Sequence, residues 1–255
     1  SKLNCDLYTH VIDWDNFKLL QKTFFKASVV NCDIPQDHVL KASQYSIAKK
    51  FDCRFFISGR SVFENLMMPK SWWWNNSDGY HIKKISKKFE NKNLSKLPIN
   101  SIFYNLFWNK HVNKYYDLKI LDKINYNSIK AEKFLIKNYN WKPYKNKHSE
   151  SVFTEFYQGY YLYHKFGIDK RIGHLSSKIK KKEIKRSQAI KIINSQPISK
   201  ERERELLKYI LKKLDFTKNE WKKIMNEEIK SHQDYPNQQW MITLYKYIFS
   251  KFKII

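Results

Sequence analysis

The sequence predicts an α/β protein. Residues 4–59 have the pattern strand, helix, helix, strand, and the remainder of the chain has the spacing of successive helices. Of the 255 residues 42% are apolar and 16% aromatic, which is enough to fill a core. A globally disordered chain is therefore excluded.

The first predicted strand and helix follow each other directly. Apolar and polar side chains alternate over residues 4–13, as in a strand, and Asp13 is a good N-cap for a following helix. In residues 14–27 the apolar positions recur every three or four residues, which predicts a helix with one buried face: Phe17, Leu20, Phe24 and Ala27.

A second helix and a second strand complete this part of the chain. The helix is predicted to start at Asp33-Ile34-Pro35 and to end at Phe51-Asp52. Residues 53–57 are a short apolar run closed by Ser58-Gly59, which is typical of a buried strand that ends at a turn. Because ligands bind beyond the carboxyl ends of strands in α/β sheets, Ser58 and Gly59 are candidate binding residues.

The rest of the chain is predicted to be helical. Helical spacing covers residues 127–139, 151–166 and 199–214, and Thr217 with Glu220 forms a capping-box signature. Two convincing strands are few against the usual five or six of a sheet. The chain is therefore expected to be the carboxyl-terminal part of a larger fold.

Glycine content excludes the common phosphate-binding loops. The five glycines of the chain are too scattered to form a Rossmann or a Walker motif: Gly59, Gly79, Gly159, Gly167 and Gly173. A nucleotide, if one is bound, is not held by such a loop in this chain.

The net charge of +25 is a weak argument for nucleic acid. Six of the 49 basic residues are arginine, whereas phosphate forks and base contacts favour arginine: Arg54, Arg60, Arg171, Arg186, Arg202 and Arg204. Lysines on a solvated surface explain the charge more simply, and a nucleic-acid partner is not expected.

Other site and compartment signals are absent from the sequence. The three cysteines form no Cys-x-x-Cys pair, and the eight histidines include no i, i+4 pair, so no metal site is predicted. The sequence contains neither an apolar run of the roughly 18–20 residues that a membrane span needs nor a signal-peptide pattern. A cytoplasmic protein is expected.

Specific motifs occur in order along nearly the whole chain: Asp13-Trp14, Phe24-Phe25-Lys26-Ala27-Ser28, Asp33 to His38, Ile57-Ser58-Gly59, Met68 to Trp72, Trp141, Lys147 to Ser151, Phe153-Thr154, Phe156 to Gln158, Tyr160-Tyr161, Lys165-Phe166-Gly167, Asp169-Lys170-Arg171, His174 to Ser177, His232 and Asp234-Tyr235-Pro236. In these motifs the sequence resembles the bacterial N-acetyl sugar amidotransferases of lipopolysaccharide and surface-sugar biosynthesis.

The resemblance implies a fold and a reaction. The family belongs to the PP-loop ATPases, so the α/β part would be a partial PP-loop sheet, Rossmann-like and similar to the adenine nucleotide alpha hydrolases, followed by a mainly helical region. The implied domains are residues 1–70 and 71–255. The implied reaction uses ATP and Mg²⁺ to convert the N-acetyl group of a nucleotide-linked sugar into an acetamidino group, with ammonia from a glutaminase subunit.

The sequence departs from this family pattern in two places. The Ser-Gly-Gly-x-Asp-Ser loop that binds the ATP phosphates does not occur in it, so a separate amino-terminal PP-loop chain is an expected partner. Arg60 stands where the family has a second glycine after Ser58-Gly59. The activity of this chain by itself is therefore in question.

The resemblance nominates several binding and catalytic residues. Lys170 and Arg171 follow a helix-ending glycine and would aim two cations at pyrophosphate or a sugar phosphate. His174 would assist proton transfer or bind substrate, and Ser176 either binds substrate or caps a helix.

Two further clusters stand at predicted helix starts. Gln36, Asp37 and His38 would either contact substrate or serve the helix N-terminus. Lys147 and His148 precede another helix, where His148 would act as an acid or a base, although helix capping by the neighbouring residues is the simpler account.

Alternative functions remain open at the level of sequence. One is a remnant without catalytic activity that binds a partner chain, and another is a basic tRNA-binding PP-loop relative. The aromatic, lysine-containing segment 240–255 suits either a core helix or attachment to an anionic membrane surface.

Overall fold

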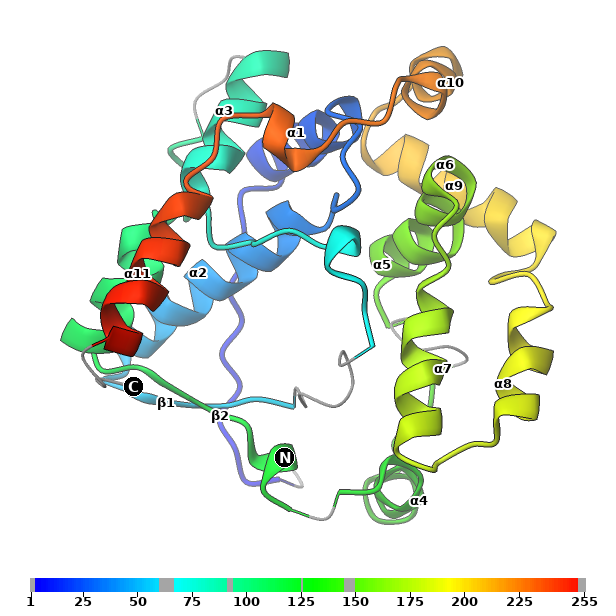
Figure 1. The fold of residues 1–255 in the computed structure, drawn as a ribbon, viewed down its shortest axis with the longest axis horizontal. Coiled ribbons are helices and arrows are strands. Elements are labelled where there is room, and N and C mark those ends of the chain that lie inside the picture. The colour runs from blue at the N-terminus through cyan, green and yellow to red at the C-terminus, as the bar shows by residue number, and fades with distance from the viewer. Residues whose placement is uncertain (1–2, 60–66, 91–93, 125, 145–149, 252–255) are drawn as a thin grey trace. The chain divides into compact units, whose positions relative to one another are not determined.

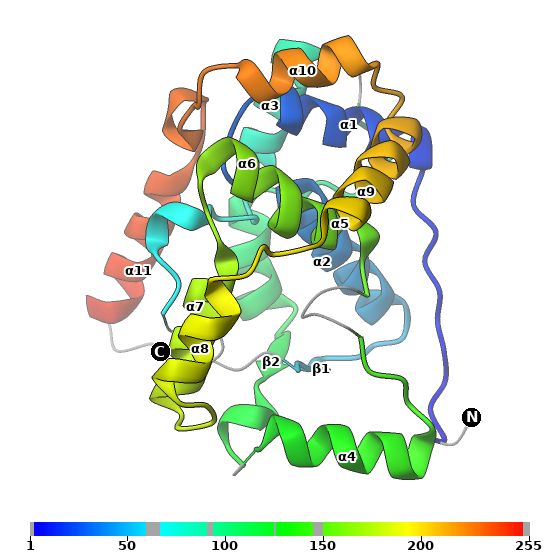
Figure 2. The ribbon, with the colours of Figure 1, turned by 90° about the vertical axis from the view of Figure 1, so that its right-hand side faces the viewer.

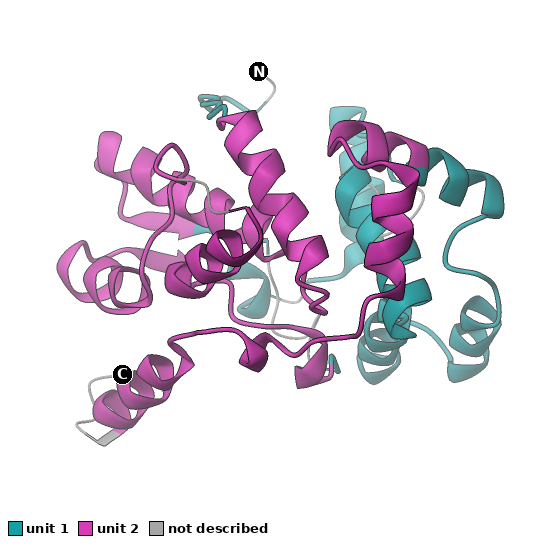
Figure 3. Ribbon diagram, turned by 90° about the horizontal axis from the view of Figure 1, so that it is seen from above, with its two compact units in different colours: residues 1–11, 57–68, 118–207 teal, residues 12–56, 69–117, 208–255 magenta. Residues whose placement is uncertain are grey.

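The computed structural model describes residues 3–59, 67–90, 94–124, 126–144 and 150–251. It divides the chain into two compact units, which interleave along the sequence (Figure 3). Unit 1 comprises residues 1–11, 57–68 and 118–207, and unit 2 comprises residues 12–56, 69–117 and 208–255.

The described residues are mostly helical (Figure 1). The helices are α1 (Trp14–Lys26), α2 (Ile34–Lys50), α3 (Gly79–Phe89), α4 (Ser128–Tyr139), α5 (Val152–Phe156), α6 (Leu162–Phe166), α7 (Lys170–Lys180), α8 (Arg186–Ile193), α9 (Lys200–Lys213), α10 (Lys218–Asn226) and α11 (Gln239–Lys251). Two π-helices, η3 (Tyr104–Val112) and η5 (Tyr157–Tyr161), and three 3₁₀ turns, η2 (Lys70–Trp72), η4 (Ile120–Asp122) and η6 (His232–Asp234), complete the helical elements.

Strands contribute little to the described fold. The strands β1 (Phe55–Ile57) and β2 (Tyr116–Leu118) form a two-stranded parallel sheet. The α/β class agrees with this mixture, although helices dominate. The backbone N–H of Tyr116 donates to the carbonyl of Arg54 at 2.8 Å, and that of Ser58 to the carbonyl of Leu118 at 3.1 Å.

Two details of the strand predictions are wrong. Residues 4–13 form no strand, and their apolar side chains Leu7 and Val11 are 92% and 84% exposed. The predicted strand at 53–57 exists as β1, but Phe55 and Ile57 are exposed instead of buried. A strand becomes buried only when other layers cover its faces, and alternation along one segment does not supply them.

The helix predictions in unit 2 are confirmed by their caps. Asp13 accepts a hydrogen bond from the backbone N–H of Asn16 at 3.0 Å at the start of α1. The helix α1 packs on α2 and α3 through its buried face. Thr217 and Glu220 form the predicted capping box of α10.

The helices α10 and α1 lie side by side in Figure 2, and aromatic side chains join them within unit 2. The ring of Phe25 meets the ring of Trp221 edge-on with centroids 5.3 Å apart, and it meets Phe216 at 6.2 Å. Such edge-to-face pairs add about 0.5–1.5 kcal/mol to the burial of their rings.

Unit 1 contains the predicted helix at residues 151–166. It is one continuous helical segment in which α5, the π-helix η5 and α6 follow each other. Ser151 caps it, Gly159 leaves room for Ile198, and Gly167 ends it with a φ of 65°. In the same unit α7 packs against α8.

Unit 2 contains a buried chain of hydrogen bonds through two histidines. The backbone N–H of Asn31 donates to His232 Nε2 at 3.2 Å, so the proton of the neutral ring is on Nδ1. His232 Nδ1 lies 3.0 Å from His81 Nε2, and His81 Nδ1 lies 3.1 Å from the carbonyl of Pro236. Every donor then meets an acceptor, with both rings neutral.

Burial keeps this pair neutral. Both rings are at most 2% exposed, and Trp74 stacks on His232 with centroids 5.2 Å apart. Desolvation and the neighbouring His81 lower the pKa of His232 to about 3, and desolvation also lowers the pKa of His81.

We expect this pair to make the protein less stable in mild acid. Because the folded pKa of His232 lies below its unfolded value of about 6.5, its contribution to stability is complete above pH 6.5 and is lost as the pH falls toward 3. Between pH 7 and pH 5 this residue alone should lower the free energy of unfolding by about 2 kcal/mol.

Urea unfolding at both pH values measures this loss. The variant His232→Leu should be less stable at pH 7 and should lose less stability on acidification. The control His10→Gln changes an exposed histidine of unit 1 and should keep the wild-type pH dependence. An unchanged pH dependence in His232→Leu would contradict the assignment.

Candidate functional site

His38 lies within unit 2 and is engaged by the backbone on both sides. The backbone N–H of Asn100 donates to His38 Nε2 at 3.0 Å, and His38 Nδ1 donates to the carbonyl of Asn76 at 2.6 Å. Burial lowers the pKa of His38, which is 2% exposed. The structure therefore gives His38 a structural role in place of the predicted substrate contact.

The neighbours of His38 remain closer to solvent. Gln36 and Asp37 lie in the first turn of α2 and are half-buried, and Asp37 accepts a hydrogen bond from the side chain of Asn76 at 3.2 Å. Negative charge is favourable at this helix end. The start of α2 has no side-chain cap hydrogen bond, and a substrate contact of Gln36 and Asp37 stays a prediction.

Arg171 was predicted to bind a phosphate, and in the structure its guanidinium is bonded within unit 1. Its Nε and Nη2 donate to both carboxylate oxygens of Asp169, at 3.0 and 2.7 Å. Its remaining N–H groups reach the backbone carbonyls of Ile192, Ser195 and Gln196 at 2.7–3.2 Å. All five donors of the guanidinium are thus used to fasten the end of α8 to the start of α7.

The other candidates on α7 share one helix but form no enclosed site in what the structure describes. Lys170 places its ammonium 5.1 Å from the ring centre of Tyr157. His174 and Ser176 are half-buried, and the next residue, Ser177, donates to the carbonyl of Gly173 at 3.0 Å. Their roles in substrate binding stay predictions.

The remaining candidates lie elsewhere. Ser58 and Gly59 follow β1 in unit 1, and Gly59 is exposed, with open space where a Cβ would stand. Lys147 and His148 lie outside the described residues. Because Gln36 to His38 belong to unit 2 and the α7 residues to unit 1, neither unit by itself contains the whole predicted set.

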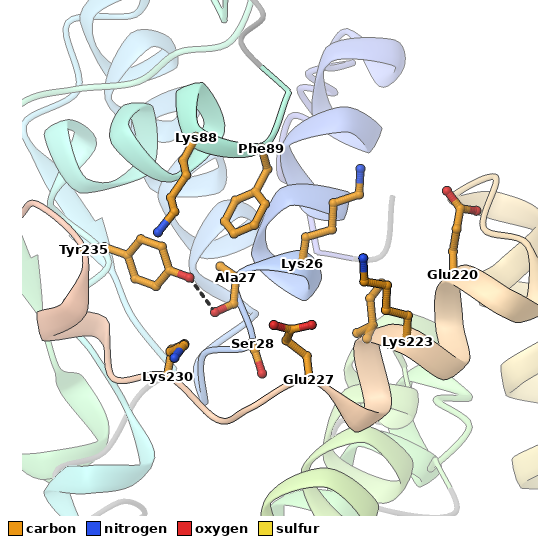
Figure 4. Close-up of a pocket in the computed structure, with 11 residues that line it drawn as sticks. Lys26, Ala27, Ser28, Lys88, Phe89, Glu220, Lys223, Glu227, Lys230 and Tyr235 are labelled. Carbon is orange, nitrogen blue, oxygen red and sulfur yellow. Dashed lines mark hydrogen bonds between the residues drawn. The ribbon is translucent and has the colours of Figure 1, made fainter.

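A pocket of about 540 Å³ lies within unit 2 (Figure 4). It is formed where the ends of α1 and α3 meet α10 and the segment that follows α10. Its lining residues are Lys26, Ala27, Ser28, Lys88, Phe89, Glu220, Lys223, Ile224, Glu227, Lys230 and Tyr235. We call this cavity the lysine pocket.

Segments about 200 residues apart in the sequence lie together to form this pocket. Tyr235 Oη donates to the carbonyl of Ala27 at 2.9 Å, as Figure 4 shows. The backbone N–H of Lys230 donates to the carbonyl of Ser28 at 3.0 Å, next to a parallel bridge between Val29 and Lys230. These hydrogen bonds hold together the segments that line the pocket, and each of them involves a backbone group.

Four lysines and two glutamates line the pocket, and two of these lysines are already paired with acidic side chains. Lys26 is paired with Glu90 at 2.5 Å, and Lys230 is paired with Glu228. Lys88 lies over the ring of Tyr235, 4.7 Å from its centre, and Lys223 forms no ion pair with a described residue. Lys88 and Lys223 are therefore available to an anionic ligand.

The carboxylate of Glu220 is already engaged. It accepts bonds from the backbone N–H and the hydroxyl of Thr217, at 2.7 and 2.9 Å, and these bonds lower its pKa. Its negative charge is thus directed to the start of α10.

The hydroxyl groups of Tyr235 and Ser28 both belong to the pocket but have different surroundings. Burial, with Asp234 and Glu227 nearby, raises the pKa of Tyr235 to about 12, so this phenol stays protonated and is not a general base. Ser28 is fully buried in the left-handed conformation, with a φ of 55°, and its Oγ has no hydrogen-bond partner. The pocket is suited to binding more than to proton transfer.

The pocket residues were not predicted as a site. Lys26 to Ser28 and Tyr235 stand in motifs that carry the family resemblance, which was the available signal. Lys88, Lys223 and Lys230 are three of many lysines, and no local pattern distinguishes them.

The protein is mainly helical in its described residues, and its unit 2 contains a pocket lined by lysines. Residues 150–248 match the family model described as LPS biosynthesis protein WbpG-like, C-terminal domain. This segment, which includes α10 and Tyr235, is thus similar to proteins of LPS biosynthesis. Neither the curated proteins nor the solved structures gave a significant match.

The described residues contain neither a metal-binding cluster nor a membrane-spanning helix. They bring together no group of three or more His, Cys, Asp or Glu side chains suited to a metal ion. Among them, no helix has the length and apolar character needed to cross a membrane.

We expect Arg171→Ala to destabilise unit 1. The change leaves the carboxylate of Asp169, which is largely buried, without its cation and frees three carbonyls after α8. The loss should be about 2–4 kcal/mol, and Arg171→Lys should recover only part of it because lysine lacks the fork. Thermal and urea unfolding measure it, with the exposed Lys178→Ala as control. Equal stability of the two alanine variants would refute the structural role.

Ser28 offers a test of strain against binding. Ser28→Gly removes the left-handed strain and should raise the free energy of unfolding by about 0.5–1 kcal/mol. Lys182→Gly does the same outside the pocket, at a φ of 59°. If the hydroxyl of Ser28 holds a ligand, only Ser28→Gly should weaken ligand binding, which calorimetry measures.

Proposed function

We propose that this protein takes part in LPS biosynthesis as the sugar-binding portion of an ATP-dependent amidotransferase. The observation that supports it most is the lysine pocket, because it joins two family-like motifs, Lys26 to Ser28 and Asp234 to Pro236, around a cationic cavity. The family match of residues 150–248 supports the same pathway.

The substrate we propose is a nucleotide-linked N-acetyl sugar. Its diphosphate carries the negative charge that Lys88 and Lys223 can neutralise, and hydrogen bonds to charged groups are the stronger ones. Phe89 and Ile224 supply apolar wall for the sugar or the base. A cavity of about 540 Å³ lies within the size range of ligand sites.

The proposed reaction replaces the amide oxygen of the acetyl group by NH. That oxygen attacks the α-phosphate of ATP, pyrophosphate leaves, and ammonia then displaces AMP. Ammonia would come from a glutaminase subunit. Since these metabolites are intracellular, we place the reaction in the cytoplasm.

The described residues do not fit ATP and Mg²⁺ in full. The sequence contains no glycine-rich loop for the phosphates, and the described side chains gather no metal-binding group. We therefore assign no step of activation to residues of this chain and propose that a separate amino-terminal PP-loop chain supplies that part. The role left to this chain is to bind and orient the sugar substrate.

Titration with UDP-N-acetylglucosamine as the probe tests the proposal. Lys223→Ala and Lys88→Ala should each weaken binding about 5- to 10-fold, because a charge contact at a partly open site is lost, and the affinity should fall with added salt. The exposed Lys212→Ala is the control and should bind like the wild type.

Binding and reaction are separated by a second measurement. With the PP-loop chain, the glutaminase, ATP and Mg²⁺ present, mass spectrometry of the sugar distinguishes the amide from the amidine. If Lys223→Ala binds the sugar nucleotide as well as the wild type does, the lysine pocket is not the binding site. Binding without amidine formation would remove the amidotransferase assignment alone.

A further inference from the structure

The helix α11 has two apolar faces. Its inner face carries Tyr245 and Phe249, which pack on His111 of the neighbouring η3; the Tyr245 Oη lies 2.8 Å from His111 Nε2, and the Phe249 ring is stacked at 4.5 Å. The opposite face carries Trp240, Leu244, Tyr247 and Ile248, which are 62%, 46%, 60% and 39% exposed. These four positions fall on one side of a helix. We call them the α11 stripe.

The neighbouring helix η3 also exposes large apolar side chains. Phe103, Phe107 and Trp108 are 50%, 36% and 43% exposed, and the first two rings stack at 5.2 Å. Figure 1 shows α11 and the green helix of η3 side by side, as the contacts of His111 require. Both elements belong to unit 2.

The two stretches of sequence that carry these side chains are basic. Residues 91–116, which include η3, and residues 235–255, which include α11, contain no aspartate or glutamate. The same two stretches contain seven lysines, and among those whose side chains the structure describes, Lys96 is paired with Asp13 at 3.8 Å and the others are Lys110, Lys114 and Lys246. A protein partner would have to supply the whole of the opposite charge, whereas an anionic lipid surface offers it together with an apolar layer.

The residue types also match an interface between water and lipid. Tryptophan and tyrosine favour the headgroup level, where an apolar ring and a polar tip are both accommodated. Lysines on the flanks reach anionic headgroups, and an amphipathic helix can lie in the interface plane without spanning the bilayer. None of the described helices could span a membrane, so any attachment through them would be peripheral.

We propose that the α11 stripe, flanked by the lysines of α11 and η3, attaches this protein to the surface of an anionic membrane. This role is independent of the lysine pocket and of the proposed reaction.

Flotation with vesicles tests this attachment. The full chain should bind vesicles of phosphatidylcholine with 30% phosphatidylglycerol and should bind pure phosphatidylcholine at least about 10-fold less. General attraction of a protein of net charge +25 is removed by repeating the flotation at roughly 0.5 M salt, where only attachment with apolar contact should persist.

The decisive variant is Trp240→Ala with Tyr247→Ala. Both side chains are exposed, so the fold should survive, which circular dichroism and melting verify. The double variant should lose binding at high salt by about 10-fold, and Trp240→Phe with Tyr247→Phe should retain most of it. Ile190→Ala, at a 49% exposed apolar residue of α8, is the control and should bind like the wild type.

Each outcome decides the proposal. Equal binding of the double variant and the wild type at both salt concentrations would overturn it, and would leave only adsorption by overall charge. Equal binding to neutral and anionic vesicles would overturn the role of the lysines. Self-association that the double variant abolishes, without any vesicle binding, would assign the stripe to a second copy of the chain.

Discussion

The neutral histidine pair at the centre of unit 2 is the constraint on which the lysine pocket depends. Its three hydrogen bonds connect the segment after α1, at Asn31, the helix α3, at His81, and the segment after α10, at His232. These same three segments continue into the pocket. Ser28 precedes Asn31, Lys88 and Phe89 end α3, and Tyr235 follows His232. The polar chain behind the pocket therefore sets the spacing of its walls.

The hydrogen bonds through the two histidines are all satisfied only when each donates in the same direction along the chain of rings. Because the N–H of Asn31 occupies one nitrogen of His232, each later proton position is determined, and both rings must be neutral. A buried polar chain that is fully satisfied rigidifies its surroundings, whereas one that loses a partner is costly. The geometry of the pocket is thus coupled to the protonation of the protein interior.

The sequence predicted local features better than long-range ones. The caps at Asp13 and at Thr217 with Glu220 were predicted correctly, because a cap depends on residues three positions apart. Residues 4–13 do not form the predicted strand, because pairing depends on a partner that alternation does not reveal. Charge and position suggested a ligand for Arg171; besides the nearby Asp169, its acceptors are backbone carbonyls more than 20 residues away, at Ile192 to Gln196. The lysine pocket was missed for the same reason, since its walls are distant in sequence.

Arginine and lysine have different roles in this protein because their side chains differ in geometry. Arg171 and Arg202 are used as forks inside unit 1, where Arg202 donates to both carboxylate oxygens of Glu155 at 2.7 and 3.2 Å. A planar fork suits a partner that never moves. The lysine pocket and the α11 surface instead carry lysines, whose flexible stems can follow a ligand or headgroup that arrives and leaves. The rarity of arginine in a chain of net charge +25 is therefore compatible with the two proposed anion-binding surfaces, because Arg171 and Arg202 hold the fold while lysines line both surfaces.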